Sequence, residues 1–167
     1  MRNVLLALLL LPLLAAAQST LIPQLAWVAK ARPNLVLVVV LAWNLASPQA
    51  ESILWAFIGG LAVDALSGGP MGATVLALLT ATVFTNFTSA RVWESHIFLH
   101  ITVAIAGTVM YYLTYSLVLV FSGWGAHWST LISIFLAASA LNTALMLLLF
   151  PPARWLASRI APRTMGM

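Results

Sequence analysis

Few residues in this sequence could carry out chemistry, and most of them stand far apart along the chain. The 167 residues include three acidic side chains, three histidines and no cysteine, which excludes thiol nucleophiles, thiolate metal sites and disulfides. His96 and His100 are four residues apart, a spacing that lets two imidazoles bind one metal ion from one helix face. A third ligand would have to come from elsewhere in the chain, for example Glu94 or His127. We favour the simpler interpretation, in which both imidazoles bond to neighbouring groups, and the sequence predicts no metal site.

Catalytic motifs are also missing from the sequence. It contains no H-E-x-x-H zinc-protease motif, no G-x-S-x-G nucleophile motif and no glycine-rich loop that would bind a phosphate. A membrane enzyme acting on lipid would need several acidic groups in one site, and only three acidic residues are present. The sequence therefore predicts a protein that is not an enzyme and that has no catalytic residues and no cofactor.

The composition indicates an integral membrane protein. The chain is 63% hydrophobic and 6% charged, with a mean hydropathy of +1.06, whereas soluble domains carry about 25% charged residues. The net charge is +4, but the basic residues stand singly between apolar runs. This pattern is typical of membrane orientation and excludes a face that binds nucleic acid.

The apolar runs predict one transmembrane domain over residues 1–167 with six helices, at 4–22, 35–46, 52–66, 71–87, 97–121 and 130–150. A span needs about 20 residues, so the second and third runs are short, and we expect two short, tilted or partly buried helices that the other four shield from lipid. Pro151-Pro152 predicts the end of the last helix. Every tryptophan falls near a predicted span end, the depth that an indole ring prefers.

Basic residues predict the orientation. The amino-terminal segment resembles a signal peptide, but its apolar run continues to Ile22, which favours an uncleaved first span. With the amino terminus in the cytoplasm, Lys30 and Arg32 lie outside, and the cytoplasmic side carries the other five basic residues, Arg2, Arg91, Arg154, Arg159 and Arg163. Lysine and arginine concentrate in cytoplasmic loops, so we expect both termini in the cytoplasm.

Amides and tyrosines inside the spans are expected to hold the bundle together. Asn44, Asn86 and Asn142 lie within or near predicted spans, and polar groups there usually bond across helices. Tyr111 and Tyr115 share one face of the fifth span, deep within it. They could line a cavity, but we favour packing inside the bundle.

The third span carries a face of small residues. Ala56, Gly60 and Asp64 recur every four residues and share one helix face, and Gly59 widens the patch. Small residues allow helix backbones to approach closely. We therefore expect a neighbouring helix to pack there, either from this chain or from a partner.

A tight turn follows the third span and brings Asp64 near the start of the fourth. Gly68 suits the end of one helix and Pro70 suits the first turn of the next, with Gly69 and Gly72 in the same turn. Because the first N–H groups of a helix lack partners within it, Asp64 could accept hydrogen bonds from them and lock the hairpin. The alternative is that Asp64 contacts a partner or Arg32.

Two stretches resemble the MreD family of rod shape-determining proteins. The first is Arg32-Pro33-Asn34, followed by an apolar run, where the family pattern has R-P-D. The second runs from Gly60 through Gly72 and matches the pattern G-x-x-x-D-x-x-S-G-x-P-x-G. Asn34 therefore stands where the family pattern has an acidic residue.

The resemblance implies an all-α integral membrane protein of the bacterial cytoplasmic (inner) membrane, with a six-helix fold similar to the substrate-binding subunits of energy-coupling-factor transporters. It implies a non-enzymatic scaffold of the cell-elongation machinery that binds MreC. Through MreC it would be linked to the actin-like MreB, the membrane wall polymerase and its class B penicillin-binding partner, and so to peptidoglycan synthesis. The alternative is a small-molecule-binding membrane subunit of a vitamin-type transporter, which would need polar groups converging from several spans.

Overall fold

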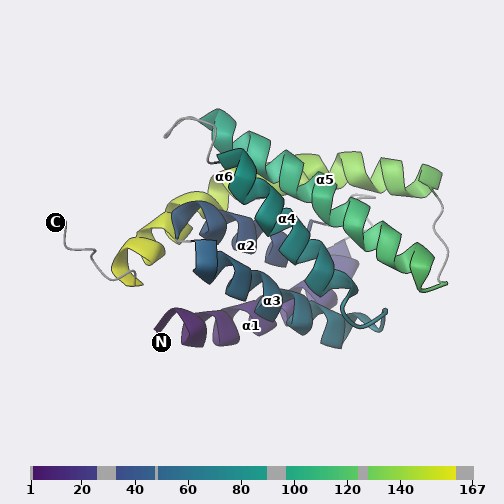
Figure 1. The fold of residues 1–167 in the computed structure, drawn as a ribbon, viewed down its shortest axis with the longest axis horizontal. Helices are drawn as coiled ribbons and strands as arrows, with labels where there is room; N and C mark the ends of the chain where they lie inside the picture. The colour runs from purple at the N-terminus through teal and green to yellow at the C-terminus, as the bar shows by residue number, and fades with distance from the viewer. Residues whose placement is uncertain (1, 26–32, 48, 90–96, 124–127, 161–167) are drawn as a thin grey trace.

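The computed structural model describes residues 2–25, 33–47, 49–89, 97–123 and 128–160. All the regular structure of these residues is helical. The helices are α1 Arg2–Leu25, α2 Leu35–Ala46, α3 Gln49–Ser67, α4 Ala73–Ser89, α5 Ile97–Phe121 and α6 Trp128–Ile160. They lie side by side in one bundle, and the start of α1 and the end of α6 lie at the same end of it (Figure 1).

Four helices contain an apolar segment long enough to cross a membrane. These segments are Arg2–Thr20, Ala50–Ser67, Phe98–Phe121 and Leu136–Ile160, whereas Leu35–Ala46 and Ala73–Phe87 are shorter. The third helix is longer than the sequence predicted, because the polar residues that precede residue 52 continue it. Glu51 lies in its first turn, where a negative charge is stabilised by the helix dipole.

The shortest helix, α2, is the centre of the bundle. At 1.5 Å per residue its 12 residues span about 18 Å, and it packs against each of the other five helices. Eight of its residues are buried, namely Val36, Leu37, Val38, Val40, Leu41, Ala42, Trp43 and Asn44. The helix is hydrophobic on every face, which suits a helix that is surrounded by protein.

The predicted end of the last helix at Phe150 is wrong. α6 continues through Pro151 and Pro152 to Ile160, and its yellow end turns away from the direction of its green part (Figure 1). Each proline removes one backbone donor and bends a helix. Packing compensates for these losses, because Ala157 is buried in the core and Leu156 and Ile160 pack against it.

Candidate functional site

Asp64 lies at the carboxyl end of α3 and accepts hydrogen bonds from the amino end of α4. Its carboxylate oxygens accept from the backbone N–H groups of Gly72 (2.8 Å), Thr74 (2.9 Å) and Val75 (3.3 Å). The side chain is 4% exposed. These N–H groups have no acceptor within α4, and the helix dipole favours an anion at this position. This is the hairpin arrangement that the sequence predicted for Asp64.

The turn between α3 and α4 differs from the prediction in one respect. Gly68 and Gly72 have φ angles of 64° and 90°, a region that glycine adopts at little cost. Because Gly72 takes this conformation, α4 begins at Ala73, and Pro70 lies before the helix instead of in its first turn. The backbone N–H of Gly69 donates to the hydroxyl of Ser67 over 3.3 Å.

Asn34 caps the amino end of α2 and joins it to α6. Its side-chain oxygen accepts from the N–H of Leu37 at 3.0 Å, and its own N–H donates to Oδ1 of Asn142 at 2.9 Å. The amide Nδ2 of Asn142 donates to the hydroxyl of Thr108 on α5 at 3.2 Å. A cap of this type needs only an oxygen acceptor, so asparagine performs it without a negative charge.

Tyr111 links Asn34 to Thr74 in the first turn of α4, whose backbone N–H donates to Asp64. Its hydroxyl interacts with the side chains of Asn34 and Thr74, and its ring stacks on that of Tyr115 with centroids 6.0 Å apart. On α1, Oε1 of Gln18 accepts from the N–H of Val36 at 3.2 Å. We call this set the Asn34 network; its members are Gln18, Asn34, Asp64, Thr74, Thr108, Tyr111 and Asn142. It includes one or more residues from each of the six helices, with Asn34 counted as the cap of α2.

The face of small residues on α3 lies inside the bundle, against helices of this same chain. Ala56 is fully buried. A Cβ added to Gly60 would lie 2.5 Å from the Cα of Val75, and one added to Gly59 would lie 2.9 Å from Cγ1 of Val36. The neighbouring helices at this face are therefore α4 and α2.

Some of the predicted residues cannot be placed. Arg32, Glu94, His96 and His127 lie outside the described residues, so neither the contact between Arg32 and Asp64 nor the histidine pair is tested. Pro33 precedes the Asn34 cap. Within the described part of the chain, no three histidine, cysteine or acidic side chains come together as metal ligands.

The opposite end of α2 contains a stacked pair of tryptophans and several buried polar atoms without partners in the described structure. The indole rings of Trp43 and Trp55 stack with centroids 4.0 Å apart and an angle of 6° between their planes. They are 2% and 1% exposed, so both rings pack inside the bundle near the end of α2 and the start of α3. Asn44 Nδ2 donates to the hydroxyl of Thr85 at 3.0 Å. Four buried atoms at this end have no partner in the described structure, Trp43 Nε1, Trp55 Nε1, Asn44 Oδ1 and Thr82 Oγ1.

Sequence reasoning did not identify Gln18, Thr74 or Thr108 as part of the site. Threonine occurs in several of the predicted spans, and nothing in the spacing of these three residues marks them. Only the order of the helices in space brings them to Asn34. Taken together, the Asn34 network can fix the relative positions of six helices, and no member of it has a buried polar side-chain atom left without a partner among the described residues.

Comparison with known proteins agrees with the two motif-bearing stretches. A family model described as rod shape-determining protein MreD matches residues 1–160 of the chain. No solved structure matches.

Proposed function

The chain belongs to the MreD family of rod shape-determining proteins, and we propose that it acts as a non-enzymatic membrane scaffold in the cell-elongation machinery. Membership places it in the rod-shape system. The proposal adds that it works by binding, with no reaction of its own, and that its main partner is MreC.

The observation that carries the proposal is the Asn34 network. Both motif-bearing stretches meet there, at buried groups that bond to one another within the chain. A solute site would need converging polar groups with spare bonding capacity. A network whose members already have partners instead holds the helices in one arrangement, which is what a scaffold requires. This supports the scaffold over the vitamin-type carrier.

The arrangement in the membrane is part of the proposal. Six helices of alternating direction leave the start of α1 and the end of α6 at one end of the bundle (Figure 1). We propose that all six occupy the bilayer of the bacterial cytoplasmic membrane, with both termini in the cytoplasm. The short α2 needs no full span of its own, because protein shields its backbone on every side.

The partners follow from the family. MreC would bind directly, and MreB, the wall polymerase and its class B penicillin-binding partner would be reached through the same assembly. The fold would be similar to the substrate-binding subunits of energy-coupling-factor transporters. Its use, however, would be to position other proteins during peptidoglycan synthesis.

Gentle detergent extraction of the tagged full chain, with mass spectrometry of everything that co-purifies, tests the proposal. We expect MreC to be enriched above an untagged control extract, and the Asp64→Asn variant to retain it. A small molecule in stoichiometric amount together with an ATPase module, and no MreC, would overturn the scaffold in favour of the carrier. Reporter fusions after Met167 and at Ser122 should report opposite sides of the membrane, and the same side for both would overturn the six-span arrangement.

A further inference from the structure

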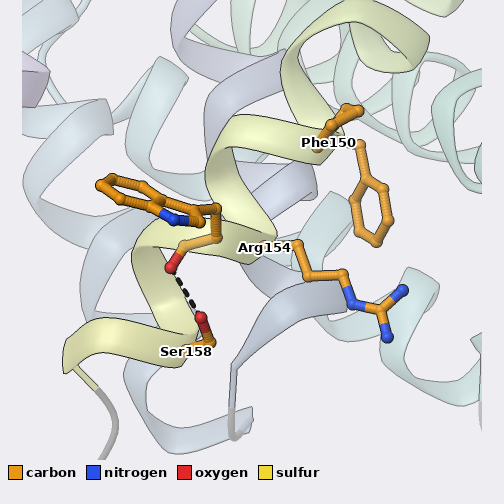
Figure 2. Close-up of a pocket in the computed structure, with 5 residues that line it drawn as sticks. Phe150, Arg154 and Ser158 are labelled. Carbon is orange, nitrogen blue, oxygen red and sulfur yellow. Dashed lines mark hydrogen bonds between the residues drawn. The ribbon is translucent and has the colours of Figure 1, made fainter.

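A groove lies on the surface of α6 just beyond its proline pair. It has a volume of about 420 Å³ and is lined by Phe150, Pro151, Arg154, Trp155 and Ser158. These residues form two neighbouring rows on one helix, since positions four apart lie one above the other. Figure 2 shows the side chains of Phe150 and Arg154 on the same side of α6.

The helix segment that carries the groove packs firmly on the core of the bundle. The opposite face of the same segment packs on the core through Ala153, Leu156, Ala157 and Ile160. At the apolar end of the groove, the ring of Phe150 meets the ring of His100 on α5 with centroids 3.9 Å apart. Packing therefore fixes which face of this segment points outward.

The outward face is basic. Arg154 and Arg159 are both exposed, and the guanidinium of Arg159 lies 5.2 Å from the centre of the Trp155 ring. Neither arginine forms an ion pair with an acidic side chain of the described residues. Of the two acidic residues in that part of the chain, Asp64 is bonded to α4 and Glu51 does not line the groove. Among the described residues, the positive charge beside the groove therefore has no acidic partner.

The order of the lining residues along the helix matches the depth profile of a phospholipid. The part of α6 without charged residues ends before Arg154, and an acyl chain would lie beside Phe150 and Pro151. Arg154 follows one turn later, about 6 Å further along the axis, at the depth of a headgroup phosphate. Trp155, at 60% exposed, is of the type that favours the membrane interface. Ser158 donates its hydroxyl hydrogen to the carbonyl of Trp155 at 2.7 Å, so the donors for a phosphate come from Arg154.

We infer that this groove binds one anionic phospholipid, with its phosphate at Arg154 and an acyl chain along Phe150 and Pro151. The occupant is a lipid and not free phosphate, because the groove joins an apolar end to a basic one. Arginine also presents several N–H donors to phosphate oxygens in a fixed geometry.

Native mass spectrometry of the full chain in detergent tests the inference, with phosphatidylglycerol or phosphatidylcholine as the added lipid. We expect tighter retention of phosphatidylglycerol, and an affinity lowered about fivefold by Arg154→Gln, the change expected for one basic residue near an anionic surface. Arg154→Lys should keep most of the affinity, and Trp155→Ala should lower it.

The matched control is Arg2→Gln, which removes an exposed arginine from the first turn of α1, at the same end of the bundle. It should change the affinity less than twofold. Equal losses in the two glutamine variants, or equal retention of the two lipids, would overturn the site. Displacement of phosphatidylglycerol by excess inorganic phosphate would show a free-phosphate site and overturn the lipid assignment.

Discussion

The two ends of α2 are equally buried but are stabilised in different ways. At the Asn34 end, Asn34, Asp64 and Asn142 are 6%, 4% and 1% exposed, and each bonds to a neighbouring helix. At the Trp43 end, Trp43, Trp55 and Thr82 are 2%, 1% and 0% exposed, and each has a polar atom without a partner in the described structure.

The two ends therefore illustrate two ways of stabilising the interior of a membrane bundle, by hydrogen bonds and by ring stacking. Hydrogen bonds define one arrangement of the helices at the Asn34 end, since a wrong arrangement would leave donors and acceptors unpaired in the protein interior. Ring stacking holds the Trp43 end, and packing of this kind is less directional. An unpaired buried polar group costs about 1–3 kcal/mol. Removing a paired polar atom at the Asn34 end should therefore destabilise the protein, whereas removing an unpaired one at the Trp43 end should not.

The largest loss of stability is expected for Asp64→Ala, which leaves the backbone N–H groups of Gly72, Thr74 and Val75 without an acceptor. We expect a loss of about 3 kcal/mol in stability, because hydrogen bonds to a charged group are worth about 1.5–3 kcal/mol each and water replaces part of the loss at this end. The variant should be depleted from membranes and should unfold at a lower temperature in detergent.

Asp64→Asn is the matched control, since an amide keeps one acceptor oxygen and loses the charge. It should remain folded and present at near-normal levels. If it is present at normal levels but no longer retains its partner or supports rod shape, Asp64 acts by charge recognition and the hairpin interpretation is wrong.

The second largest loss of stability is expected for Gly60→Ala. The added methyl would lie 2.5 Å from the backbone Cα of Val75, so α4 must move away and the bond from the Val75 N–H to Asp64 would lengthen. We expect a cost of about 2–3 kcal/mol, at the upper part of the range for overpacking, measured by thermal unfolding in detergent.

Gly107→Ala is the control for this substitution. The three atoms nearest its added methyl would be side-chain atoms of Leu41, which can shift more easily than a helix backbone, so we expect a smaller cost of about 1 kcal/mol. Equal costs at the two positions would show that close approach of α3 and α4 does not matter for the Asn34 end.

Local chemistry made parts of the fold predictable from the sequence. The bounds of α2 and α5 equal the predicted ranges because polar or helix-breaking residues flank both apolar runs. The bonds of Asp64 were predictable because their donors lie eight to eleven residues away along the chain. The contact between Asn34 and Asn142 was not, since it joins residues 108 apart and depends on how the helices are ordered in space. The course of α6 beyond Pro151 was mispredicted for the same reason: burial of Ala157 outweighs a local rule.

A smaller loss is expected for Asn142→Ala. The substitution removes the acceptor of the Asn34 N–H and the donor to Thr108, and hydrogen bonds between membrane helices average about 0.6 kcal/mol with a maximum near 1.7. We expect a cost of about 1–2 kcal/mol by detergent unfolding. The control is Ser139→Ala, one turn earlier on α6, where the buried hydroxyl oxygen has no partner in the described structure; it should be close to neutral. If both variants lose stability equally, the pairing of Asn142 is not what stabilises this end.

The smallest change in stability is expected for Thr82→Val, and it should be a gain instead of a loss. Thr82 and Thr108 are both 0% exposed, but the hydroxyl of Thr108 donates to the carbonyl of Ala104 and accepts from Asn142, whereas that of Thr82 has no partner in the described structure. Valine keeps the shape of threonine and removes the hydroxyl. Thr82→Val should therefore stabilise the protein by about 0.5–1 kcal/mol, because an unpaired buried hydroxyl is removed, and Thr108→Val should destabilise it by a similar amount.

Both changes can be measured as shifts in the unfolding midpoint in the same detergent. A loss of stability from Thr82→Val would show that a water molecule or a partner chain bonds to this hydroxyl in the membrane, and the contrast between the two ends of α2 would fail at this residue.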